Sequence, residues 1–480
     1  MTSPSRPESA LAFISYTPQG PSDPDARKTI RSHVMRGKNR RRPRPRMASW
    51  MSGELQRRPR PETTSAVQAA LPMPRHVGSV LSFTTFPDDM EPYMLQDVVH
   101  FLNIVKKALY PFEAILMSDK RESFWYNNLT VDSAYLHSVI FSSQTYYDSM
   151  RGNTSNPVAV KHLIKALKIV AERMSLGGSD ATSNATISAV VSLAMAAYFF
   201  GDYEAGEMHM KGLYKIVSLR GGLSAFKGDA HGIQSKVCRV DLGYSLCTGQ
   251  KPLFFADRIP WDSYIATHPP IANFDPPPPP DGVANVTRFL ESLDWRLVNV
   301  WRDLYHFSQL GNLAAQTGRR LQHDAFHEMM ASIHYRLLHL SLDDSPAQEA
   351  VRLGMLAFAA TVFLQWVGMR LRFHCLGDTL ERALRRLRDE VQDAPPWLVV
   401  WLIISGHIVV IQEAEGTWMH ELLSETLGRL GPPSWDQARD MLRGIMWIDL
   451  LYDTPGRAIF EEAVARLKGQ ETASPALEPG

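Results

Sequence analysis

The stretch NPVAVKHLIKALKIVAERMSLGG, residues 156–178, shows most clearly how this chain folds. Asn156 is a good helix cap, and Pro157 suits the first helical turn. Apolar residues then recur at intervals of three and four, and the pair Gly177-Gly178 stops the helix. The stretch therefore predicts one amphipathic helix, whose apolar positions are Val160, Leu163, Ile164, Leu167, Val170 and Met174.

Comparable patterns follow on both sides of this helix. Residues 184–198 and 205–217 predict a helical hairpin that turns at Gly201-Asp202. Further helical stretches are predicted at residues 286–313, 326–342, 347–370, 376–393, 397–430 with breaks at Gly406 and Gly416, and 435–452. We therefore expect an all-α fold, a large multi-helix body of helical hairpins in a solenoid-like bundle.

The last of these helices has clear predicted ends. Ser434 and Gln437 have the spacing of a capping box before the apolar stripe begins. Residues 453–456, Asp-Thr-Pro-Gly, combine a helix-breaking proline with a glycine. We therefore expect the helix to end before Pro455.

Composition divides the chain into five segments. Residues 1–85 are rich in Pro, Ser, Thr and Arg and predict a disordered basic arm, with a short helix near residues 23–36. Residues 86–267 and 285–468 predict two helical halves. The segment 268–284 between them contains five consecutive prolines and predicts a surface linker. Residues 469–480 predict a disordered tail.

Two apolar stretches resemble membrane spans. Residues 353–369 and 397–411 contain 17 and 15 residues, with Gln365 and His407 inside them. A spanning helix needs about 20 consecutive apolar residues. We therefore expect both stretches to be central helices of a large core, and we expect no contact with a membrane.

The signatures of common enzymes are missing from the sequence. It contains no GxxxxGK[ST], GxGxxG or GxSxG pattern. Its three cysteines, Cys238, Cys247 and Cys375, lie in apolar helical surroundings, where a buried and inert thiol is the usual role. The sequence therefore predicts a protein that is not an enzyme and that carries no cofactor.

Histidines offer the best metal candidates. His323 and His327 are four residues apart and can share a helix face, with Asp324, Glu328 and His334 nearby. The HDAFH pattern, however, lacks the glutamate positions of HExxH and HxxEH. We therefore predict no metal site.

Positive charge is concentrated near the N-terminus. Residues 27–60 contain 13 Lys and Arg and one acid, Glu54, which gives this segment a net charge of +12. The rest of the chain has 38 basic and 49 acidic residues and a net charge of −11. This separation predicts that the arm meets a polyanion or an import receptor while the body has another task.

The densest part of the arm fits a nuclear import signal and a non-specific contact with nucleic acid phosphates. Arginines alone do not read bases, so we expect little sequence preference. The alternative is a solvated tail that prevents aggregation. The predicted import and nucleic-acid residues are Arg27, Lys28, Arg31, Arg36, Lys38, Arg40, Arg41, Arg42, Arg44 and Arg46.

Several segments together resemble a known family. At the N-terminus they are Phe13-Ile14-Ser15-Tyr16, Asp25-Ala26-Arg27-Lys28 and Arg31-Ser32-His33-Val34-Met35-Arg36. In the body they are Gly201-Asp202, His209-Met210-Lys211-Gly212-Leu213, Val217-Ser218-Leu219-Arg220-Gly221-Gly222-Leu223, Arg239-Val240-Asp241-Leu242, Gly249 and Pro252. Near the C-terminus they are Trp435, Arg439, Leu442, Trp447, Asp449, Asp453, Pro455, Gly456 and Phe460. In this order they resemble the fungal-specific transcription factor domain family.

The resemblance implies a nuclear regulator of transcription with a large all-helical body for regulation and partner binding. Family members that bind DNA directly usually carry an N-terminal zinc cluster of six cysteines, whereas this chain has no cysteine before Cys238. Sequence-specific DNA binding is therefore not implied. Three readings stay open: the arm attracts DNA non-specifically, a partner subunit reads the bases, or the chain no longer binds DNA. The partner can be another protein or a second copy of the chain.

A rival hypothesis is a small-molecule receptor or an enzyme with a pocket between the two helical halves. Large helical cores do hold ligands in some proteins. The residues expected to line such a pocket are Trp366, His374, Trp401 and Trp418.

Overall fold

The computed structural model describes residues 85–88, 90–105, 110–117, 122–153, 156–226, 231–255, 259–268, 274, 278–364, 373–410, 417–431 and 433–473. Within these ranges the chain is all-helical and has no strand, which confirms the predicted all-α class. The basic arm and the short helix expected near residues 23–36 lie outside the described residues.

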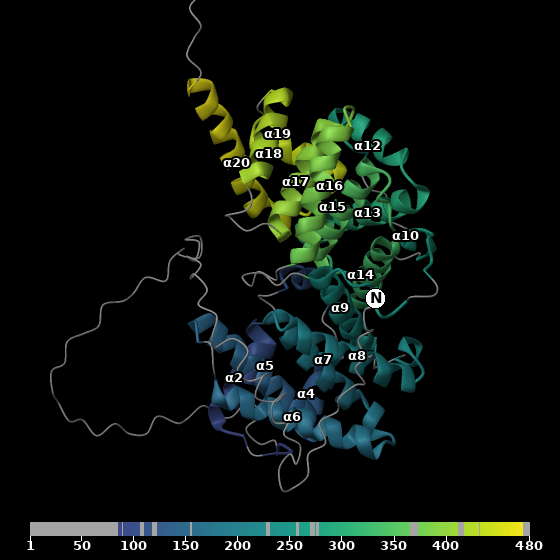
Figure 1. Cartoon of the computed structure of the whole chain (residues 1–480), viewed down its shortest axis with the longest axis vertical. Helices are drawn as coiled ribbons and strands as arrows, with labels where there is room; N and C mark the ends of the chain where they lie inside the picture. Colours follow the sequence, from purple (N-terminus) through teal and green to yellow (C-terminus); the bar gives the residue numbers. More distant parts are fainter. Residues whose placement is uncertain are drawn as a thin grey trace, which may run out of the picture.

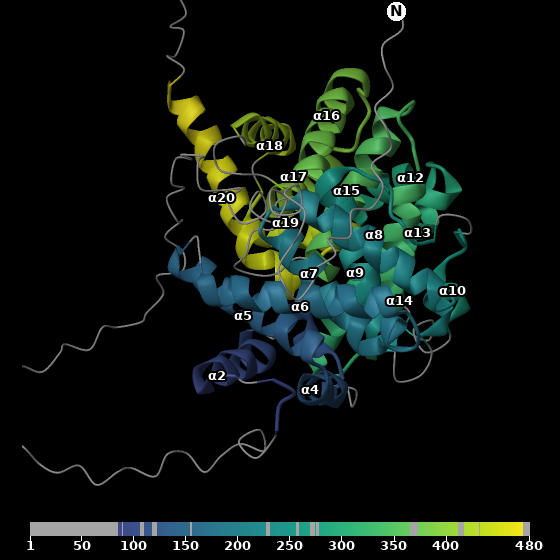
Figure 2. The same cartoon turned by 60° about the horizontal axis from the view of Figure 1, so that its bottom comes forward.

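The elements formed by residues 85–255 lie mostly in the lower part of the molecule in Figure 1. They are α2 (Pro92–His100), the π-helical turn η3 (Phe101–Val105), the 3-10 turn η4 (Pro111–Ile115), α4 (Glu122–Val131), α5 (Ser133–Arg151), α6 (Pro157–Leu176), η5 (Asp180–Thr182), α7 (Asn184–Phe199), α8 (Tyr203–Leu219), η6 (Leu223–Ala225) and α9 (His231–Thr248). Figure 2 shows α5 and α6 side by side across one face.

The helices that follow form the upper part in Figure 1. They are α10 (Tyr264–Thr267), η8 (Asp281–Val283), α12 (Ala284–Glu291), α13 (Trp295–Thr317), α14 (His323–His339), α15 (Pro346–Phe363), α16 (His374–Glu390), α17 (Pro396–Val410), α18 (Thr417–Leu430), α19 (Trp435–Ile445) and α20 (Asp449–Ala473). Helix α9 packs on α7 and α8 and also on α14 and α16, so it joins the two sets of helices.

Buried side chains from both sets share one large hydrophobic core, and residues of α2, α4 and α5 form a second, smaller cluster. At the centre of the large core Phe112 of η4 stacks on Phe326 of α14, with ring centroids 5.3 Å apart, and lies 5.5 Å from Phe307 of α13. Phe363 of α15 completes the group at 5.0 Å from Phe326. Aromatic pairs at these distances add to the stability gained by area burial. The short η4 turn is thus anchored in the core of the later helices.

Local signals in the sequence set several helix ends as predicted. The side chain of Asn156 accepts hydrogen bonds from the backbone amides of Val158 and Ala159 at 2.9 and 3.2 Å. Gly177 ends α6 with a φ of 70°, a value that favours glycine. Helices α7 and α8 form the predicted hairpin, and Ser434 and Gln437 form the predicted capping box of α19.

The predicted single helix over residues 435–452 is wrong. Helix α19 ends at Ile445, and α20 begins at Asp449. Asn312 of α13 stabilises this break from outside: its amide donates to the Trp447 carbonyl at 2.8 Å and accepts from the Asp449 amide at 2.9 Å. The indole of Trp401 donates to the Met446 carbonyl at 2.7 Å. Tertiary hydrogen bonds therefore replace those of a continuous helix.

The helix end predicted at residues 453–456 is wrong as well, because α20 continues through Pro455 to Ala473. The Asp453 carboxylate binds Arg439 at 2.6 Å and the Trp447 indole at 2.8 Å. Gly456 lies so close to Trp447 that a β-carbon would be 2.6 Å from the indole ring. These contacts fix Asp453 and Gly456 on the inner face of a helix and outweigh the cost of the proline.

Two further predicted boundaries differ from the structure. The break predicted at Gly406 is wrong, because α17 runs through this residue. Gly406 has a packing role instead: its missing β-carbon lets α17 lie close to Leu380. The stretch 286–313 is divided between α12 and α13, since Asp294 caps α13 by accepting from the Arg296 amide at 2.8 Å. The break expected at Gly416 lies outside the described residues.

The two apolar stretches belong to α15 and α17, and nearly all described residues of these stretches are buried. None of the described helices has both the length and the apolar character that a crossing of the lipid bilayer requires.

Candidate functional site

The ten predicted import and nucleic-acid residues, from Arg27 to Arg46, lie outside the described residues. The structure therefore does not test them, and they stay a prediction. The described part of the chain offers buried polar groups and a cavity as candidate sites.

The four residues expected to line a pocket between the halves have separate surroundings. Trp366 lies outside the described residues, and His374 is exposed at the start of α16. Trp401 is buried, with its indole bonded to the backbone. Trp418 lies beneath two surface cations, with the guanidinium carbons of Arg385 and Arg388 at 4.2 and 5.4 Å from its ring centre.

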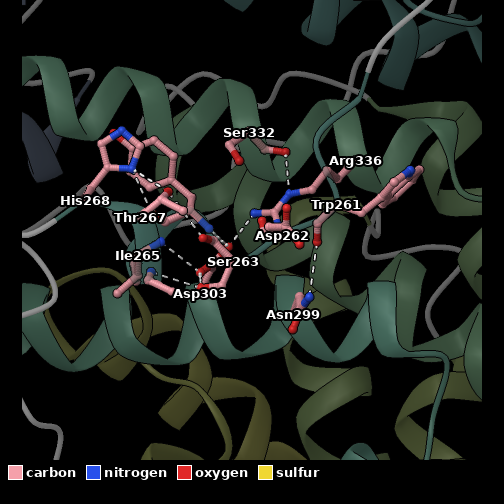
Figure 3. Close-up of polar contacts among 12 residues, drawn as sticks. Trp261, Asp262, Ser263, Ile265, Thr267, His268, Asn299, Asp303, Ser332 and Arg336 are labelled. Atoms are coloured by element: carbon pink, nitrogen blue, oxygen red, sulfur yellow. Dashed lines mark hydrogen bonds and ion pairs between the residues drawn. The ribbon is translucent and has the colours of Figure 1, made fainter.

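A buried ion pair joins α13 to α14 and is drawn in Figure 3. The Asp303 carboxylate accepts from the Arg336 guanidinium at 2.5 Å, and both side chains are almost fully buried. Arg336 also donates to the carbonyl of Ser332 at 3.1 Å and to that of Asp262 at 3.2 Å. Each of its three guanidinium nitrogens thereby donates to a protein acceptor.

Asp303 also holds the start of α10. It accepts from the Ser263 hydroxyl at 2.5 Å and from the backbone amides of Tyr264 and Ile265 at 2.9 and 3.2 Å (Figure 3). With the guanidinium it has four donors, which match the four lone-pair sites of a carboxylate. A saturated and buried carboxylate has no capacity left for a substrate, so this cluster fastens residues 259–268 to the core.

The histidine pair of α14 does not converge with His334. His323 Nδ1 lies 3.5 Å from His327 Nε2, whereas His334 is buried and bonds the Met330 carbonyl of its own helix at 2.8 Å. Burial lowers the pKa of His334 to about 4, so it is neutral at physiological pH. The described part of the chain holds no group of three or more His, Cys, Asp or Glu residues placed to bind a metal ion.

The cysteines of α9 are buried thiols. Burial raises the pKa of Cys238 and of Cys247 to about 12, so both are protonated at physiological pH. A thiolate is the form that acts as a nucleophile. These two cysteines therefore have no catalytic activation.

A second buried polar cluster lies between α5 and α6. His137 Nδ1 is 2.9 Å from His162 Nδ1, and His137 Nε2 is 2.8 Å from the Asp88 carboxylate, which also binds Lys165 at 2.7 Å. Because the carboxylate accepts, His137 donates from Nε2 and accepts at Nδ1 from His162. Burial lowers the pKa of both histidines, that of His162 to about 4.

A cavity of about 120 Å³ lies between α5, α7 and α9 and is partly open to solvent. Its wall is mostly apolar and includes Phe101 and Leu102 of the π-helical turn η3. Such turns are frequent at functional sites. The other apolar wall residues are Val139, Met195, Ala196 and Phe200.

Arg239 of α9 supplies the buried charge of this cavity. Its side chain is almost completely buried and stacks on the Tyr110 ring, with the guanidinium carbon 4.5 Å from the ring centre. Its Nη atoms lie 3.4 and 3.5 Å from Glu113 Oε1, and among the described residues its Nε has no hydrogen-bond partner. Burial acts to lower the pKa of Arg239, but Tyr110 and Glu113 raise it, so the cation persists.

The cavity thus combines an apolar wall with a few polar groups at one side. Lys236 of α9, Ser142 of α5 and Ser192 of α7 also line it. Burial raises the pKa of Tyr110 well above its ordinary value, so its phenol stays neutral. This arrangement is typical of a small-molecule binding site.

Sequence analysis did not identify Arg239 as a site residue, although it belongs to the motif Arg239-Val240-Asp241-Leu242. One signal was available: Arg239 and Asp241 are charged residues in an otherwise apolar run. A charged residue inside an all-round apolar helix is buried and therefore has a specific partner. The Asp241 carboxylate has three hydrogen-bond donors: the backbone amides of Leu253 and Phe254 and the Tyr335 hydroxyl.

No family model, no curated protein and no solved structure matches this chain.

Proposed function

We propose that this chain is a nuclear regulator of transcription, in which the basic arm mediates import and attracts nucleic acid and the helical body regulates and binds a partner. The observation that carries this proposal is the segregation of charge: +12 within residues 27–60 against −11 in the remainder. The likeness to fungal-specific transcription factor domains supports it as well. The described body supplies a large helical core, which such a regulatory domain needs.

Import is tested by deleting residues 38–46 from the full chain and imaging a tagged protein in cells. The deletion removes Lys38, Arg40, Arg41, Arg42, Arg44 and Arg46. We expect loss of nuclear accumulation. A matched control replaces Arg57, Arg58 and Arg60 by glutamine and is expected to leave accumulation intact. Unchanged nuclear accumulation of the deletion variant contradicts the import role.

Attraction to nucleic acid is tested by measuring binding to two unrelated DNA duplexes over a series of salt concentrations. Each phosphate contact releases counterions, so the affinity falls steeply as salt rises. We expect equal affinity for the two duplexes and loss of binding when residues 27–60 are deleted. Binding that survives high salt, or that selects one duplex, contradicts a purely electrostatic arm.

The cavity beside Arg239 favours a second candidate function, a body that binds a small molecule. The cavity has a mostly apolar wall, and the buried Arg239 that lines it has no hydrogen-bond partner at Nε among the described residues. This function is compatible with a regulator, since a ligand that binds one conformation of the body better than another shifts the equilibrium between them. Its test is the ligand experiment described below.

A further inference from the structure

We propose that the cavity between α5, α7 and α9 binds a small monocarboxylic acid with an apolar body, whose carboxylate pairs with Arg239. The inference concerns the body alone and does not depend on the basic arm. It rests on three observations: the size of the cavity, the incomplete pairing of a buried cation and the apolar character of the wall.

Size limits the ligand. The cavity measures about 120 Å³. A cavity of about 150 Å³ lined by apolar side chains holds one benzene molecule. The space beside Arg239 therefore accepts a single aromatic ring or a short aliphatic chain, and the partly open side leaves room for a small substituent.

Charge selects an acid. The contacts between Arg239 and Glu113, at 3.4 and 3.5 Å, are long for a charge-assisted hydrogen bond, whose ordinary length is about 2.7–2.9 Å. Nε of Arg239 is buried and has no partner in the described part of the chain. A guanidinium binds a carboxylate through charge-assisted hydrogen bonds, and the Arg239 side chain lines the cavity that would hold one.

Lys236 adds a second cation to the cavity lining, one helical turn before Arg239. A second carboxylate on the ligand would lie against the apolar wall, which penalises an unpaired charge. The site therefore favours monocarboxylates over dicarboxylates.

The wall selects the apolar body. Met195 and Ala196 of α7 face the same cavity as Val139 of α5 and Leu102 of η3. Burial of the ligand's hydrocarbon part against these side chains supplies the non-directional part of the affinity. The phenol of Tyr110 stays neutral, so it does not repel the ligand carboxylate.

The test titrates the full chain by calorimetry at neutral pH with benzoate and hexanoate and with their neutral amides, benzamide and hexanamide. Each acid matches its amide in shape, so the comparison isolates the charge. Hydrogen bonds to charged groups differ enough from neutral ones to predict at least about tenfold tighter binding of the acids. Equal affinity of acid and amide, or no binding of any probe at millimolar concentrations, overturns the proposal.

Variants locate the site. Arg239→Met is expected to abolish the preference for acids, whereas Arg443→Met, which changes an arginine of α19 outside the cavity lining, keeps it.

Ala196→Leu fills the cavity and leaves every charge in place, so it is expected to weaken benzoate binding at least about tenfold. If Arg239→Met fails to fold, Ala196→Leu decides, and unchanged benzoate binding by that variant refutes the site. Loss of import or DNA binding leaves all these outcomes unaffected.

Discussion

Replacement of Asp303 by alanine is expected to destabilise the fold strongly. The variant leaves the Arg336 guanidinium buried without its counter-ion, at a side-chain exposure of 1%. Removal of one partner from a buried ion pair costs about 3–5 kcal/mol. The amides of Tyr264 and Ile265 lose their acceptor as well. We therefore expect a loss of at least about 3 kcal/mol in the free energy of unfolding.

The reciprocal variant Arg336→Met is expected to cost less. Asp303 then keeps three donors, the Ser263 hydroxyl and the amides of Tyr264 and Ile265, so its charge stays hydrogen-bonded. The double variant Asp303→Ala/Arg336→Met is expected to be less destabilised than the sum of the single variants, because it leaves no buried unpaired charge.

Urea unfolding of the full chain, followed by circular dichroism, measures these differences. The control is Glu381→Ala, which breaks the exposed pair of Glu381 and Arg385 on α16. Exposed pairs of this spacing contribute about 0.3–0.5 kcal/mol. Amide hydrogen exchange adds a local readout, since residues 259–268 are expected to lose protection in Asp303→Ala. The reasoning is refuted if Asp303→Ala costs no more than the control, or if the double variant costs the full sum.

Three further predictions concern packing, pH and the break between α19 and α20. Gly354→Ala places a β-carbon 2.2 Å from Leu402 and is expected to lower the melting temperature. Gly212→Ala places its β-carbon more than 4 Å from the side chains and backbone of other elements and is expected to raise the melting temperature by improving helix propensity. A lower melting temperature for Gly212→Ala than for Gly354→Ala contradicts the packing. His162 has a folded pKa of about 4 against an ordinary 6.5, so the unfolded chain gains protons first and stability is lost as pH falls from about 6.5 towards 4. Urea unfolding midpoints at pH 7 and pH 5 measure this loss of stability. If His162→Gln loses as much stability between the two pH values as the unchanged chain does, His162 is not the cause. Asn312→Ala leaves two backbone groups without their partner and is expected to cost about 2 kcal/mol or more in urea unfolding; a cost near zero means that the break does not need Asn312.

The helix ends show how far local sequence information reaches. Asn156 and Gly177 were predicted as the two ends of α6. Each acts on the helical turn that adjoins it in the chain. The prediction failed at Pro455, where contacts with residues of other elements hold the helix through a proline. Capping depends on neighbours a few residues away in the chain, whereas the contacts that override a helix breaker come from neighbours in space.

The candidate site was harder to predict than the fold. Arg239 and Phe101 lie 138 residues apart in the sequence and line the same cavity. No motif marks such a pair, because a cavity is a product of how α5, α7 and α9 pack. The sequence indicated only that a charged residue inside an apolar helix needs a partner. The choice of Glu113 and Tyr110 as those partners belongs to the tertiary structure.

The sequence by itself determined the all-α class, because hydrophobic periodicity and caps are local properties of the chain. It also determined where charge is concentrated, since charge is a property of composition. Only the tertiary structure decided the break at Met446–Ile448, the saturation of Asp303 and the incomplete pairing of Arg239. The physical reason is that a buried polar group is stabilised by whichever donors and acceptors packing brings to it, and packing joins residues that the sequence keeps far apart.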